Sequence, residues 1–95
     1  MKALTNDEIA DFLAREPLWI FAEGKLLREW RLKDFLAAMA FVNRVAAMAE
    51  DAAHHPDIDI RYNRVRLGLV THDAGGVTAR DASMAAQLSR KFPLE

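Results

Sequence analysis

Two short segments, one near each end of the chain, repeat apolar residues at the three- and four-residue spacing of an amphipathic helix. The first begins at residues 5–8, Thr-Asn-Asp-Glu, which have the spacing of a capping box, and it ends before Pro17. The last follows Thr78, which with Asp81 resembles a second N-terminal cap, and it ends at Pro93. The pattern therefore predicts a helix near each end.

The longest periodic segment, residues 35–53, follows Asp34, whose carboxylate suits the positive end of a helix dipole. At 100° per residue its apolar positions cover an arc of about 200°, wider than the ~100° stripe that one contact needs. These positions are Phe35, Met39, Phe41, Val42, Val45, Ala46, Met48 and Ala49. We expect one side to pack on a sheet and the other to contact a second copy of the chain, unless another helix covers it.

Four further segments have the character of strands. Residues 18–22 are apolar and aromatic, and Glu23-Gly24 separates them from residues 25–32, as in a hairpin. Residues 58–62 and 65–71 alternate apolar with charged or small residues, which is typical of half-buried strands. The second pair also follows one short turn, so the chain predicts two hairpins.

In the last strand the core face is Val65, Leu67, Leu69 and Thr71. The same parity turns Gly68 and His72 to the other face, where Gly68 should leave open space beside it. The element order is helix, two strands, helix, two strands, helix. A four-stranded antiparallel sheet with three helices on one face satisfies these patterns, and predicts an α+β fold in a single domain, residues 1–95.

Composition excludes several classes of protein. The 13 basic and 14 acidic residues give a net charge of −1, and there is no cysteine. No basic patch therefore indicates nucleic acid or an anionic membrane as a partner, and neither a disulfide nor a thiolate site can form. No segment approaches the roughly 18 apolar residues of a membrane span, and the polar residues 5–8 leave no room for a signal peptide. We expect a soluble, cytoplasmic protein.

All three histidines fall in two short motifs, His54-His55-Pro56 and Thr71-His72-Asp73. Imidazole is the side chain whose unperturbed pKa lies near neutral pH, so it can both give and take a proton there. Pro56 ends the long helix and moves His55 out of helical backbone. The grouping predicts a small acid–base site rather than three unrelated surface histidines.

Nearby carboxylates could orient these rings. Glu50 precedes His54 by four residues, so it would lie beside that ring on one helix face. Asp73 or Asp81 could do the same for His72. With these partners, the residues predict acid–base catalysis that needs no metal.

Other chemistry fits less well. His54 and His55 are adjacent and poorly spaced to bind one ion from one rigid element, so we predict no metal site. Ser83 and Ser89 lie on a helix without the turn that exposes a nucleophilic serine, and Gly75-Gly76 is too short for a phosphate loop.

Two motifs resemble those of the pterin-4a-carbinolamine dehydratase family. They are residues 50–56, EDAAHHP, and residues 71–81, THDAGGVTARD, and the upstream stretches 30–35 and 40–46 are similar to the same family. The likeness covers about residues 26–82. The departures are Gly68, where a small polar residue is more usual, and Leu32 in place of an aromatic residue.

The resemblance implies dehydration of 4a-hydroxytetrahydrobiopterin to the quinonoid dihydropterin, with no metal or organic cofactor. It implies a catalytic set of His54, His72 and His55, in which His54 and His72 form the acid–base pair and His55 mainly holds the pterin. Glu50 and Asp81 would orient the imidazoles. It also implies homodimers joined through sheet edges and homotetramers joined through the helix at 35–53.

Two alternatives remain open. Some animal members of the family also serve as dimerisation cofactors of a homeodomain transcription factor through the same long helix, so the chain could be a protein-binding module. The fold could also act on a different small molecule. The three histidines favour the enzyme, because a scaffold has no need for all of them.

Overall fold

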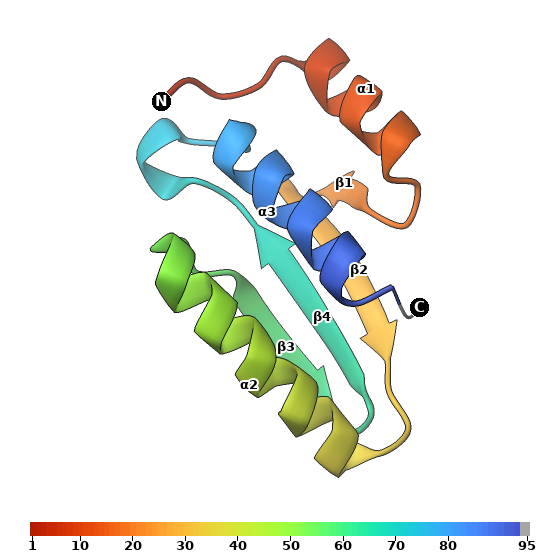
Figure 1. Ribbon diagram of the computed structural model, residues 1–95. Coiled ribbons are helices and arrows are strands. Elements are labelled where there is room, and N and C mark those ends of the chain that lie inside the picture. The colour runs from red at the N-terminus through yellow and green to blue at the C-terminus, as the bar shows by residue number, and fades with distance from the viewer. Residues whose placement is uncertain (94–95) are drawn as a thin grey trace.

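The computed structural model describes residues 1–93 and has three helices on one face of a four-stranded antiparallel sheet (Figure 1). The elements are α1 (Asn6–Arg15), β1 (Ile20–Ala22), β2 (Lys25–Arg31), α2 (Phe35–Ala52), β3 (Asp57–Arg61), β4 (Arg64–Leu69), the short 3-10 helix η1 (His72–Ala74) and α3 (Ala79–Lys91). The predicted α+β fold and its element order are confirmed. Within the described part of the chain, no helix is both long and apolar enough to cross a membrane.

The strands lie in the order β1-β2-β4-β3, so the two longest strands are central. The β1–β2 turn places both Glu23 and Gly24 at positive φ, 57° and 74°, as a tight hairpin turn requires. The β3–β4 turn has Tyr62 at φ 55°, and the side-chain amide of Asn63 donates to the Leu32 carbonyl oxygen at 3.0 Å. This last bond ties the second hairpin to the segment that enters α2.

Side chains that face the helices form the core. On β2 and β4 these are Leu26, Arg28, Trp30, Val65, Leu67 and Leu69, all of them buried. Three aromatic rings connect the sheet with the helices. The ring centroid of Trp30 lies 5.1 Å from that of Phe41 in α2, and the centroid of Phe41 lies 5.0 Å from that of Phe92, which follows α3. The sheet and two helices therefore share one packed cluster.

The core also holds a buried cation that the alternating pattern did not predict. Arg28 lies 4.3 Å above the Trp30 ring and donates to Ser89 Oγ at 2.8 Å. The Trp19 indole N–H donates to the same oxygen at 2.9 Å. Ser89 of α3 thus accepts hydrogen bonds from a sheet residue, Arg28, and from Trp19, which precedes β1.

The two sides of α2 differ. Asp34 caps its first turn by accepting from the Ala37 N–H at 2.8 Å, and the buried side consists of Ala38, Phe41, Val45 and Ala49. On the outer side, Phe35 and Leu36 are 48% and 79% exposed, so neither α1 nor α3 covers them within one chain. One side of the wide apolar arc packs on the sheet, as expected.

As predicted, Gly68 leaves open space on the sheet face away from the helices, where it helps to line a hollow of about 160 Å³. A Cβ at this position would lie 3.0 Å from Leu27 Cδ2 and 3.6 Å from the Asp57 Cβ. Leu27 and Asp57 are its two cross-strand partners, and their side chains border the same hollow from both neighbouring strands. The glycine permits this close approach.

Candidate active site

The end of α2 sets the direction of His54. Ala53 adopts the left-handed conformation at φ 52° and ψ 39°. The Ala53 N–H bonds to the Glu50 carbonyl oxygen at 3.2 Å, and the His54 N–H bonds to the Ala49 oxygen at 3.1 Å. This pair of bonds is a Schellman motif with alanine in place of the usual glycine. It ends the helix and turns His54 towards α3.

His54 there meets a buried acid. Its Nε2 lies 2.5 Å from Asp81 Oδ1, and the His54 side chain is only 10% exposed. Asp81 is completely buried in the first turn of α3, where it also completes the capping box with Thr78. A buried carboxylate is costly unless its oxygens accept hydrogen bonds. The contact with His54 is therefore part of what permits this acid in the interior.

The second oxygen of Asp81 joins α3 to the end of β4. Oδ2 accepts from the Thr71 hydroxyl and from the Thr78 backbone N–H, both at 2.8 Å. The two threonine hydroxyls lie 2.8 Å apart. The capping motif at Thr78 and Asp81 was predicted, but the link to Thr71 was not. The signal for it was a threonine at the last core-facing position before a histidine.

The predicted pairing of Glu50 with His54 was wrong. Glu50 instead pairs with His55, whose Nε2 lies 2.5 Å from Glu50 Oε2, with both side chains mostly exposed at 76% and 63%. The i,i+4 argument assumed that the helix continues to His54. Because Ala53 is left-handed, the helix stops at Ala52 and His54 turns away from Glu50. The residue after His54, His55, reaches back to Glu50 instead.

His72 lies at the surface at the start of η1. Its loop is closed by two backbone bonds between Thr71 and Gly76, at 3.0 and 3.4 Å, and Gly75 is left-handed at φ 71°. The structure does not pair Asp81 with His72 directly, because that carboxylate faces His54 and Thr71. Asp81 nevertheless bonds the residue next to His72, so the end of α2, the loop after β4 and the start of α3 meet at one end of the sheet (Figure 1).

A hollow of about 180 Å³ adjoins His54 between α2 and α3. It is lined by Ala52, His54, Arg80, Ser83, Met84 and Gln87. Arg80 Nη2 donates to the Ala53 carbonyl oxygen at 2.8 Å, which holds the residue just before His54. Sequence reasoning missed Arg80, since a lone arginine in a first helical turn carries no distinct signal. Among residues 1–93 no three His, Cys, Asp or Glu side chains gather as metal ligands would.

A protein family and several individual proteins match this sequence along nearly its whole length. The family described as Pterin 4 alpha carbinolamine dehydratase matches residues 2–91. A protein of Chloroflexus aurantiacus is 54% identical over 88 residues, which cover 93% of this chain and 95% of that one. A protein of Acidobacterium capsulatum is 56% identical over 88 residues, with 93% and 96% covered. Both bear the name "Putative pterin-4-alpha-carbinolamine dehydratase".

A solved structure has the same fold. The crystal structure of transcriptional coactivator/pterin dehydratase from Brucella melitensis matches with a TM-score of 0.86 and 34% identity. The match covers 94% of this chain and 97% of that one. The family match, the two relatives and the shared fold agree: this chain belongs to the pterin 4 alpha carbinolamine dehydratase family.

Proposed function

We propose that this protein is a hydro-lyase that dehydrates a 4a-hydroxytetrahydropterin, such as the biopterin form, to the quinonoid dihydropterin. The hydroxyl oxygen on the carbinolamine carbon takes up a proton and leaves as water. The lone pair of the neighbouring nitrogen forms the C=N bond, and that nitrogen loses its proton. One proton enters and one leaves, so the reaction needs an acid and a base but no redox partner. Family membership supports this activity.

The observation that carries the mechanism is the contact between His54 and the buried Asp81. An ionised carboxylate only accepts hydrogen bonds, so the bond requires a proton on His54 Nε2 and leaves the lone pair of Nδ1 available in the neutral ring. In this proposal His54 takes the proton from the pterin nitrogen, and Asp81 stabilises the resulting imidazolium. The arrangement is suited to a base held in one tautomer and one orientation.

His72 is the proposed acid. It is exposed and lies next to Thr71, which donates to the same carboxylate that holds His54. In this position it can protonate the leaving hydroxyl and regain a proton from water. His55, whose ring bonds Glu50 at the surface, is proposed to hold and orient the pterin.

We also propose that the chain acts as a homodimer or homotetramer. The exposed Phe35 and Leu36 give α2 an outer apolar side that a second copy of α2 would cover. The outer edges of β1 and β3 offer unpaired backbone groups for a second contact. The Brucella melitensis protein is named a transcriptional coactivator as well as a pterin dehydratase, which supports one alternative function for this chain, binding of a partner protein through α2.

The test is a stopped-flow measurement of 4a-hydroxytetrahydrobiopterin decay with and without the protein. We expect His54→Ala and His72→Ala each to slow the catalysed decay about 10²–10⁴-fold. Arg90→Gln, at the far end of α3, serves as the matched control and should keep the wild-type rate. Wild-type protein without effect on the decay would refute the activity. Wild-type rates in both folded histidine variants would refute only the acid–base assignment.

A further inference from the structure

The face of the sheet that carries no helices has an uneven distribution of charge. Two rows of side chains cross the three longest strands on this face. In the first row Arg66 lies between Glu29 and Asp59, its partners on β2 and β3. In the second row Arg64 lies between Arg31 and Arg61, so three arginines are adjacent.

The two rows have different electrostatic energies. An acid on each side of Arg66 is favourable, whereas like charges directly opposite each other on neighbouring strands are destabilising. Arg61 is partly compensated, because its Nε lies 3.3 Å from Asp59 Oδ1. Arg31 and Arg64 form no ion pair with any residue in the described range 1–93. The row of three arginines is therefore an unfavourable arrangement in the free protein.

The charges of the two rows do not cancel. Four guanidinium groups face two carboxylates, which leaves two positive charges in a chain whose net charge is −1. Glu23, in the β1–β2 turn, forms an ion pair with Arg66 at 3.7 Å, which lowers the excess at this surface to one positive charge. The excess positive charge is thus concentrated around Arg64.

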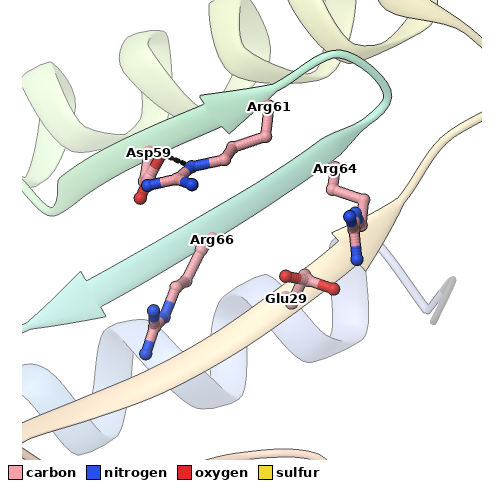
Figure 2. Close-up of a pocket in the computed structure, with 5 residues that line it drawn as sticks. All are labelled: Glu29, Asp59, Arg61, Arg64 and Arg66. Atoms are coloured by element: carbon pink, nitrogen blue, oxygen red, sulfur yellow. Dashed lines mark hydrogen bonds and ion pairs between the residues drawn. The ribbon is translucent and has the colours of Figure 1, made fainter.

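These residues surround a hollow. Glu29, Asp59, Arg61, Arg64 and Arg66 line a depression of about 240 Å³ that is open to solvent. Figure 2 shows the Arg61 guanidinium turned towards Asp59, while Arg64 and Arg66 extend towards β2 on either side of Glu29. Several N–H donors thus border one concave surface.

We propose that this hollow binds a small anion that carries two linked phosphate groups. The guanidinium fork donates two parallel hydrogen bonds to phosphate oxygens, and bidentate contacts of this kind are the strong ones. Neighbouring strands lie about 4.8 Å apart, so the arginine row extends about 10 Å at the backbone. An elongated anion of this kind can contact several of these groups at once, and its negative charge compensates the excess positive charge.

The surface fits nucleic acid less well. Proteins that bind single strands stack the bases on aromatic side chains. Trp30 lies in the core and Phe21 pairs with Leu26 of the core side, and the exposed Tyr62, in the β3–β4 turn, does not line the hollow. The hollow is also on the sheet face away from the helices, whereas His54 and Asp81 lie on the helix side. The proposal is therefore independent of the proposed dehydratase activity.

The test is a titration of the full chain with inorganic diphosphate at constant ionic strength, followed by amide NMR shifts. Saturable shifts of residues 29–31, 59–61 and 64–66 are expected. Arg64→Gln and Arg66→Gln, which each remove an arginine that lines the hollow, should each weaken binding roughly tenfold. Arg64→Lys keeps the charge but loses the fork, so it should also bind more weakly than wild type. Arg90→Gln, an exposed arginine on α3, is the matched control and should bind like wild type.

A second measurement separates a binding site from a purely structural role. If the row of arginines is unfavourable without a ligand, Arg64→Gln should raise the Tm of the free protein at low salt while it weakens diphosphate binding. Shifts that do not saturate, or that are equal in Arg64→Gln and wild type, would overturn the proposal. Tighter Arg64-dependent binding of a single-stranded oligonucleotide than of diphosphate would overturn the choice of a small anion. Decay assays of the carbinolamine report separately on the dehydratase.

Discussion

The substitution Asp81→Asn tests the network around His54 with the smallest change in shape. An amide has one oxygen and one NH₂, so it can keep only one of the two acceptor positions of the carboxylate. Oδ2 accepts from the Thr71 hydroxyl and from the Thr78 backbone N–H, whose direction is fixed by the backbone, whereas Oδ1 accepts only from His54. The amide oxygen should therefore take the Oδ2 position, and the NH₂ should face His54.

His54 can adapt to a donor by changing its tautomer. Its Nε2 then accepts from the amide, and the proton moves to Nδ1, where the wild-type ring has its lone pair. Because no buried donor stays unpaired, the loss of unfolding free energy should be near the lower end of the range for such changes, about 1 kcal/mol. For a domain of this size that corresponds to a fall in Tm of about 4–8 °C.

The catalytic loss should be much larger than the loss of stability. A ring with its proton on Nδ1 cannot accept the pterin proton there, and the imidazolium has no counter-charge. We expect the catalysed decay to slow by about 10²-fold or more. Nitrogen-15 spectra of the imidazole would report the tautomer, thermal unfolding the stability, and stopped-flow decay the rate.

Two comparison variants show whether the effects of Asp81→Asn come from the loss of the carboxylate beside His54. Asp11→Asn, an exposed acid on α1, should leave tautomer, Tm and rate as in wild type. Asp81→Ala, which removes both acceptor oxygens, should be less stable than Asp81→Asn by about 1–3 kcal/mol. If folded Asp81→Asn dehydrated the pterin at the wild-type rate, the view that Asp81 fixes the tautomer of a basic His54 would be refuted.

Two further predictions concern association and pH. Leu36→Glu should reduce the size of an assembly joined through α2, as measured by size-exclusion chromatography, and an unchanged elution volume would exclude that surface. Leu36 is a better choice than Phe41, because Phe41 is buried in the core and a charge there would unfold the monomer. The pKa of Lys25 is raised above its ordinary value because its ammonium donates to Asp57 at 2.6 Å, aided by the charge of that carboxylate. Since the folded-state pKa is the higher one, the contribution of the pair is complete below the ordinary lysine pKa and is lost as pH rises through the raised value. An NMR titration should show the shift, and Asp57→Asn should remove it.

The fold was accessible from the sequence because its local signals agree with each other. Apolar spacing, the caps at Thr5 and Thr78 and the two short turns all indicate the same order of elements, and the structure follows that order. Contacts between individual side chains on different strands were harder to predict from the sequence. The alternation along β4 predicted the open space beside Gly68, but it could not predict that Leu27 of the neighbouring strand comes close enough to leave little room for a Cβ there.

The site shows the same limit most clearly at one residue. The sequence indicated the histidines and acids, but assigned Glu50 to His54 on the assumption of continuous helix. The left-handed Ala53 decides otherwise, and alanine is not a residue that normally marks that conformation. Its conformation is supported by two Schellman bonds and by Arg80 on its carbonyl oxygen, a side chain 27 residues away in sequence. The orientation of His54 therefore depends on the packing of α3 against the end of α2, and only the folded chain determines which acid each histidine meets.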